Sequence, residues 1–218
     1  MGATTTRIQG IVFTSGTIGG TRIVAVQSGV GKVSAAMATT LLLDHLAPSA
    51  VVFSGTAGAV DPDLEPGDVV IGTGVGYHDY GNMTGDGIVR TPTRDYASGR
   101  IDPAFFTPGS DLIAAARRAA KAMTGMRIRE GFIVTGDAFM SSPAHRTELR
   151  RALNAAAVEM EGAAVAQVCL RFGVPVIVIR SVTDHAEGNS SQSYATFRDK
   201  AARNAADLAI ATIREFVK

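Results

Sequence analysis

Short runs of apolar and β-branched residues alternate along this chain with longer stretches that have a helical period. The runs predict strands over 11–15, 22–28, 50–54, 68–74, 131–135, 156–159 and 174–181. The longer stretches predict helices over 32–45, 110–123, 144–153, 161–172 and the closing segment to 217. In the closing segment one stripe is formed by Ala205, Leu208, Ala209, Thr212, Ile213 and Phe216, the spacing of a helix that packs on a sheet.

Most of the predicted strands are apolar on both faces, a pattern typical of parallel strands covered by helices on both sides. We therefore expect a single domain over residues 1–218 with an α/β fold, a three-layer α/β/α sandwich around a mixed, mainly parallel sheet. The run 174–179 is the most apolar and is predicted to be central. Ligands of such folds bind beyond the carboxyl ends of the strands, so functional residues should follow strands.

The segment 77–108 breaks the alternation, because it is rich in Gly, Pro, Asp and Thr and has no apolar period. A loop of this length inside a compact domain is usually functional or lies at an interface.

Charge and composition favour a small partner. Lys plus Arg number 21 against 20 for Asp plus Glu, so the chain lacks the basic surplus expected for binding nucleic acid or an anionic membrane. No apolar run approaches the roughly 20 residues that span a bilayer, and no signal peptide is visible at the start of the chain. The single Cys169 lies among apolar residues and is expected to be a buried thiol in a reducing compartment, so a cytoplasmic location is expected.

Several familiar motifs fail on detail. The glycines of 28–32 follow a strand, but Val26 and Val33 occupy positions where a phosphate loop needs Gly and Ser or Thr, and Ser34 replaces the third glycine of a dinucleotide fingerprint. There is no Gly-x-Ser-x-Gly elbow, and the histidines have no spacing of a metal site. No metal or cofactor is predicted.

Two carboxylate motifs follow predicted strands. In 158–163 a buried strand gives way to a helix at Glu159 and Glu161; either residue can be a helix cap, but a carboxylate there can also accept hydrogen bonds from vicinal ribose hydroxyls. Asp184 follows the most apolar strand and can protonate a purine leaving group. It can equally serve as a partner of Arg180 or as a cap.

These segments together resemble the purine nucleoside phosphorylase and uridine phosphorylase superfamily, especially the 5′-methylthioadenosine/S-adenosylhomocysteine nucleosidases. The likeness runs almost the length of the chain. It rests on Ser28-Gly-Val-Gly-Lys-Val33, Ser54-Gly-Thr-Ala-Gly-Ala59, Pro66-Gly-Asp-Val-Val70, Tyr77-His-Asp79, Thr135-Gly-Asp-Ala-Phe139, Val158-Glu-Met-Glu161 and Arg180-Ser-Val-Thr-Asp184.

The resemblance implies a nucleoside site in which Asp184 protonates the base and Glu161 holds the ribose hydroxyls. The other substrate-binding positions that it implies are Thr56, Ala57, Gly58, Phe139, Met140, Glu159, Met160, Thr183 and Tyr194. It also implies a homodimer in which the segment 77–108 helps to close the 5′ side of the neighbour's site.

Two departures from the family pattern matter. Phe53 stands where hexameric purine phosphorylases carry a phosphate-binding arginine, which weakens the phosphorylase interpretation. The family's first strand and its water-activating carboxylate find no match in residues 1–10, so we expect an N-terminally short chain that is less stable than a longer form and hydrolyses nucleosides slowly. If it proves fully active, Asp79 and Glu159 are the first candidates for another base.

The sequence therefore predicts an enzyme that hydrolyses the N-glycosidic bond of adenine nucleosides such as methylthioadenosine or adenosylhomocysteine and releases adenine. The alternatives are a phosphorolytic purine nucleoside phosphorylase and a catalytically weak nucleoside-binding protein of the same fold. The 5′ substituent and the exact base preference stay open.

Overall fold

The structure, a computed structural model, describes residues 3–188 and 190–218. The strands are β1 (Thr4–Ile8), β2 (Ile11–Ile18), β3 (Thr21–Val26), β4 (Val51–Ala59), β5 (Val69–Tyr77), β6 (Gly81–Thr84), β7 (Gly87–Arg90), β8 (Ile128–Thr135), β9 (Ala155–Glu159) and β10 (Val176–Asp184). The helices are α1 (Lys32–Leu46), α2 (Ser110–Ala122), α3 (Pro143–Leu153), α4 (Gly162–Phe172) and α5 (Ser190–Phe216).

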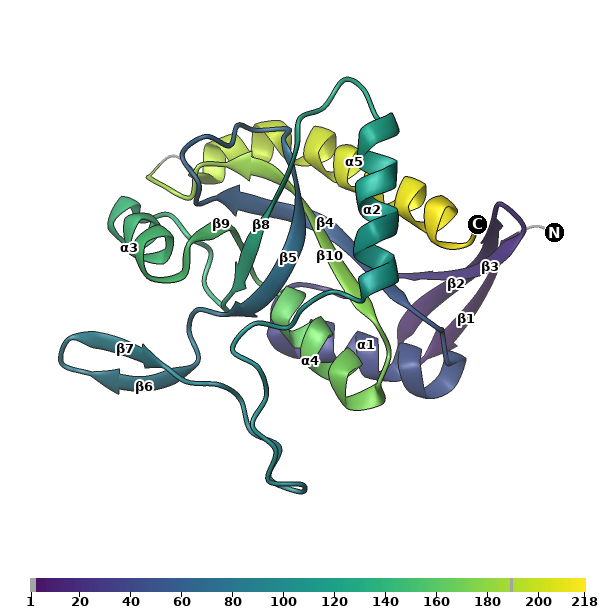
Figure 1. The fold of residues 1–218 in the computed structure, drawn as a ribbon, viewed down its shortest axis with the longest axis horizontal. Helices are drawn as coiled ribbons and strands as arrows, with labels where there is room; N and C mark the ends of the chain where they lie inside the picture. Colours follow the sequence, from purple (N-terminus) through teal and green to yellow (C-terminus); the bar gives the residue numbers. More distant parts are fainter. Residues whose placement is uncertain (1–2, 189) are drawn as a thin grey trace.

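The central sheet is mixed and mainly parallel, as predicted. β10 pairs with β4, β5 with β8 and β8 with β9 in parallel, whereas β10 with β5 and β4 with β9 are antiparallel. Helices α2 and α5 pack on one side and α1 and α4 on the other (Figure 1). The sequence did not predict that the pairing closes into a ring in the order β10-β4-β9-β8-β5, with the predicted central strand β10 bonded on both edges.

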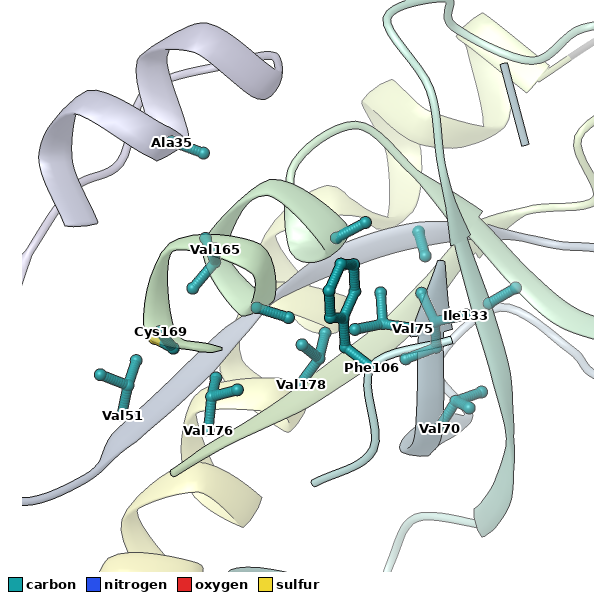
Figure 2. Packing of buried hydrophobic residues seen from close by; sticks show 14 of the residues in the cluster. Ala35, Val51, Val70, Val75, Phe106, Ile133, Val165, Cys169, Val176 and Val178 are labelled. Carbon is teal, nitrogen blue, oxygen red and sulfur yellow. The ribbon is translucent and has the colours of Figure 1, made fainter. Parts of the chain in front are cut away.

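Successive side chains of β5 and β10 point alternately to the two sides of the sheet, and this explains why these strands are apolar on both faces. In β10, Val176 and Val178 belong to a cluster with the residues of α4, whereas Ile177 and Ile179 pack with Leu208 of α5. Figure 2 shows the first cluster, which includes Val165 and Cys169 of α4, Val176 and Val178 of β10, and Phe106. Because successive side chains of a strand point to opposite faces, two helical layers require an unbroken apolar run. Cys169 is fully buried, as expected.

A separate antiparallel sheet is built from β1, β2 and β3. Strands β2 and β3 pair antiparallel, with Ile18 opposite Thr21. Gly19 and Gly20 form the connection and have φ values of 57° and 85°, which suits a two-residue turn that needs left-handed backbone at both positions. The pattern of residues did not predict β1, because its side chains are mostly exposed and polar.

The segment 77–108 contains the short hairpin of β6 and β7, which projects from the body of the molecule (Figure 1). Its side chains are mostly exposed, so it shows no clear apolar period. The segment returns to the core at Asp102, whose buried carboxylate accepts hydrogen bonds from Thr93 at 2.6 Å and from both terminal nitrogens of Arg171 at 2.8 and 2.7 Å. The buried Asp102 thus ties this segment to α4.

No helix in the described part of the chain combines the length and apolar character that crossing a membrane requires. Within residues 3–188 and 190–218 no His, Cys, Asp and Glu side chains gather into a group suited to a metal ion.

Candidate active site

A cavity of about 410 Å³ opens at the carboxyl ends of β4, β9 and β10. This volume lies within the roughly 300–1,000 Å³ typical of small-molecule sites. The structure brings all the predicted site residues to this cavity: Thr56, Ala57, Gly58, Phe139, Met140, Glu159, Met160, Glu161, Thr183, Asp184 and Tyr194. The other lining residues were not predicted as ligand contacts, and they are Ser28, Gly29, Val30, Phe53, Ser54, Gly55, Ala138, Val158 and Arg180.

An irregularity in the pairing of β10 with β4 shapes the cavity near Asp184. The register runs from Val182 opposite Ala57 to Asp184 opposite Gly58, so Thr183 is an extra residue on β10. Neighbouring residues of a regular strand point to opposite faces, but a bulge can re-aim a side chain. Thr183 and Asp184 both line the cavity as a result.

Asp184 is the last residue of β10 and is 2% exposed. Its Oδ2 accepts a hydrogen bond from the Thr183 hydroxyl at 2.8 Å, and its Oδ1 accepts one from the Ala186 amide at 2.8 Å. Gly58 leaves room for this carboxyl, since a β-carbon there would lie 3.0 Å from Oδ1. These contacts fix the orientation of Asp184 at the cavity wall, where it is placed to exchange a proton with a bound ligand.

Glu159 also lines the cavity, but the chain itself occupies its carboxylate. The oxygens accept hydrogen bonds from the amides of Glu161 at 3.1 Å and Gly162 at 2.7 Å, from the Thr135 hydroxyl and from Arg180. Amides at a helix start lack partners within the helix, so Glu159 caps α4 through its side chain. This is the cap role that the sequence left open, and it fixes the turn that presents Glu161.

Glu161 is only partly engaged. Its Oε1 accepts a hydrogen bond from the Gly31 amide at 2.9 Å, and its Oε2 lies 3.4 Å from Nη2 of Arg180. Burial raises the pKa of Glu161, and the charge of Glu159 adds to this rise, while Arg180 opposes it. The carboxylate retains free acceptor positions that can receive hydroxyl groups of a ligand.

Arg180 is the buried cation of the cavity, and sequence reasoning considered it only as a partner of Asp184. It pairs instead with Glu159 and more loosely with Glu161. Its guanidinium lies 4.3 Å from the centre of the Phe53 ring and passes directly over Gly55, where a β-carbon would overlap Nη1. Arg180 lies opposite Gly55 on the neighbouring strand. A glycine opposite an arginine points to this contact, but only when the strand register is known.

Aromatic and apolar side chains border the mouth of the cavity. Phe139 is 47% exposed and meets the Tyr194 ring edge to face, with centroids 5.9 Å apart and an interplanar angle of 82°. An exposed aromatic ring beside a cavity can stack on a planar ligand such as a purine base. Asp79, the other candidate base, is not part of the cavity lining and pairs with Lys32 at 2.9 Å.

Comparisons with known proteins identify similar sequences and folds. The family model described as "Phosphorylase superfamily" matches residues 3–216. A 5′-methylthioadenosine/S-adenosylhomocysteine nucleosidase of Shewanella piezotolerans is 39% identical over 98% of this chain and 90% of its own length.

Solved structures of two such nucleosidases are similar to the whole fold. The enzyme of Colwellia psychrerythraea in complex with adenine has a TM-score of 0.86 and 35% identity over 99% of this chain and 87% of its own. The enzyme of Neisseria meningitidis in complex with methylthio-immucillin-A also has a TM-score of 0.86 and 35% identity, over 97% of this chain and 89% of its own.

Proposed function

The chain belongs to the phosphorylase superfamily, and from this premise we propose that it hydrolyses the N-glycosidic bond of adenine nucleosides and releases adenine. The substrates are 5′-methylthioadenosine and S-adenosylhomocysteine, the compounds that give the similar enzymes their name. The observation that carries the proposal is a nucleoside-sized cavity with Asp184 and Glu161 both in its wall.

The two carboxyl groups have different tasks in the proposed reaction. Breaking the bond between C1′ and the purine leaves the bonding electrons on the base, and a proton from Asp184 neutralises them. Glu161 accepts hydrogen bonds from the ribose hydroxyls and holds the sugar while positive charge develops at C1′. A water molecule then adds to C1′ and releases a proton, which through solvent replaces the one that Asp184 gave up, so that adenine and the free sugar are the products.

The remaining wall residues position the nucleoside. We assign the purine to the side of Phe139, Met140 and Tyr194, and the sugar to Met160 and the strand end at 56–58. Thr183 orients Asp184 through its hydroxyl. Glu159 acts on the substrate indirectly, because it holds Arg180 and the start of α4.

The charge of the cavity supports water over phosphate as the nucleophile. Arg180 is the only Lys or Arg among the described residues that line it, and its charge is already matched by Glu159 and Glu161. Phe53 covers the face of its guanidinium. A phosphate dianion would therefore be repelled by two carboxylates, with no free cation to compensate. Water is neutral and would not be repelled.

The deciding experiment is incubation of the chain with methylthioadenosine, with and without phosphate, while adenine and sugar products are separated and quantified. We expect adenine and methylthioribose at a rate that does not depend on phosphate. A phosphate-dependent rate with a ribose 1-phosphate product would establish phosphorolysis instead. Binding of methylthioadenosine without any adenine release would establish a nucleoside-binding protein.

We further propose that the chain forms one domain and that two copies pair as a homodimer through the α1 face. Val33 and Met37, one helical turn apart on α1, are 80% and 50% exposed, and Met83 of the hairpin is 79% exposed. Neighbouring large apolar side chains exposed at a surface, such as Val33 and Met37, are typical of protein interfaces.

A further inference from the structure

Two of the segments that line the cavity are loops joined to each other by charged side chains. One is the turn before α1, which contributes Ser28, Gly29 and Val30, and the other is the loop after β8, which contributes Phe139 and Met140. Loops lack the regular hydrogen bonds that fix helices and strands, so their positions depend on side chains elsewhere.

A cluster of three charged residues outside the cavity joins these two segments, and we call Lys32, Asp79 and Asp137 the Lys32 clasp. Nζ of Lys32 donates to both carboxylate oxygens of Asp79 at 2.9 Å and lies 3.5 Å from Oδ2 of Asp137. The Lys32 amide donates to Oδ1 of Asp137, and the Asp137 amide donates to Oδ2 of Asp79, both at 2.9 Å. Every pair in the clasp is therefore bonded directly.

The clasp is one or two residues away from groups that face the cavity. Gly31, which precedes Lys32, donates its amide to Oε1 of Glu161 at 2.9 Å. Asp137 lies two positions before Phe139. At Gly31 the φ of 86° favours glycine, and a β-carbon would lie 3.2 Å from Oδ1 of Asp137. A shift of the turn at Lys32 would therefore displace both the Gly31 amide, which donates to Glu161, and the loop that carries Phe139.

Lys32 carries the one positive charge of the clasp, so it holds the two aspartates together. Burial alone would raise the pKa of Asp79, but hydrogen bonds from Lys32 and from the Asp137 amide outweigh it and hold this pKa below its ordinary value. Asp79 is therefore ionised at neutral pH. Without Lys32, two carboxylates would face each other at the junction of the two loops, and their repulsion would separate them.

Resting on the proposed function, we propose that Lys32 is a positioning residue for nucleoside binding, because the clasp that it holds sets Glu161 and Phe139 at the cavity. It touches neither the substrate nor the reacting atoms. The clasp leaves Asp184 unaffected, since none of its members contacts that residue or its hydrogen-bond partners.

The test compares Lys32→Met with the wild-type chain in steady-state assays of adenine release and in calorimetric titrations with adenine. We expect KM for methylthioadenosine to rise by about tenfold or more while kcat changes by less than about threefold, since contacts shared by the ground and transition states weaken while the acid and the charge of Glu161 are kept. Adenine affinity should fall as well, through the Phe139 loop. Lys32→Arg, which keeps the charge, should restore most of the affinity.

The control is Arg117→Met, which breaks the exposed pair of Arg117 with Glu130 at 2.7 Å, neither of which lines the cavity, and should leave KM unchanged. If Lys32→Met is unstable, Asp137→Ala, which leaves the Lys32–Asp79 pair, must show the same rise in KM. An unchanged KM and adenine affinity, or a loss of kcat alone that follows a lower melting temperature, would overturn the proposal. Failure of the wild type to release adenine would instead refute the proposed function, and the adenine titrations would still decide the role of the clasp.

Discussion

Asp184 is the side chain on which the proposed proton transfer depends. In Asp184→Asn the amide can still hydrogen-bond a purine but cannot supply an acid proton, so adenine release should fall by about 10²–10⁴-fold. The dissociation constant for methylthioadenosine should change far less. Both quantities are measured on the same preparation, by product analysis and by calorimetry. Equal turnover by the variant and the wild type would remove Asp184 from the mechanism.

Glu161 should make nucleoside binding depend on pH. Its carboxylate must be ionised to accept both ribose hydroxyls, so affinity is present above its pKa and is lost as pH falls through it. Because burial raises this pKa, with Glu159 adding to the rise and Arg180 opposing it, the loss should begin at a higher pH than for an ordinary glutamate. Titration with a nucleoside between pH 4 and 8 measures the profile.

Two comparisons isolate this effect. Glu161→Gln should bind the nucleoside weakly at every pH because a ribose contact is lost, and it should turn the nucleoside over slowly because the negative charge that faces the positive charge developing at C1′ is lost as well. Adenine, which has no ribose, should bind the wild type without this acid-side loss. If Glu161→Gln retains the same acid limb as the wild type, another group titrates and the assignment is wrong.

The pairing of β4 with β10 is the element contact that places the buried arginine. Arg180 lies opposite Gly55, and a β-carbon at Gly55 would overlap its guanidinium. Gly55→Ala should therefore displace Arg180 from Glu159, with a destabilisation of about 1–3 kcal/mol from overpacking. Adenine release should fall with it, because Glu159 fixes the turn that carries Glu161.

Gly16→Ala in β2 is the matched control, because no atom lies within 4 Å of a β-carbon at that position. Chemical denaturation and adenine release are measured for both variants. If Gly55→Ala and Gly16→Ala behave alike, close packing of Arg180 on β4 has no role in stability or activity.

At the scale of the whole molecule, we expect the chain to form a homodimer. A carboxylate in place of Val33, as in Val33→Glu, should dissociate the proposed homodimer, because the charge would be buried without a partner at the interface. Sedimentation velocity measures the change in mass. Ile210→Glu on α5, which is 37% exposed and lies outside the α1 face, is the control and should remain dimeric. A monomeric wild type at micromolar concentration would contradict the proposal.

Sequence alone was sufficient for the kinds of elements and the main features of the fold. Runs such as Val176–Ile179 are apolar at every position, the pattern of a strand that is buried on both faces between two helical layers. Helix stripes and the positions of Glu161 and Asp184 after predicted strands are local features, so they were predicted without coordinates. The roles of the cavity residues came from the family resemblance and stay predictions.

Contacts between distant segments were decided only by the tertiary structure. The closure of the strands into a ring depends on which edges meet, and the strand pattern does not encode that choice. The same holds for Arg180, whose partners Glu159 and Phe53 belong to other strands, and for Lys32, whose partners lie 47 and 105 positions away along the chain. A charged side chain read in isolation resembles a solvated surface group. Its burial and its partners, which give it a function, exist only once the chain has folded.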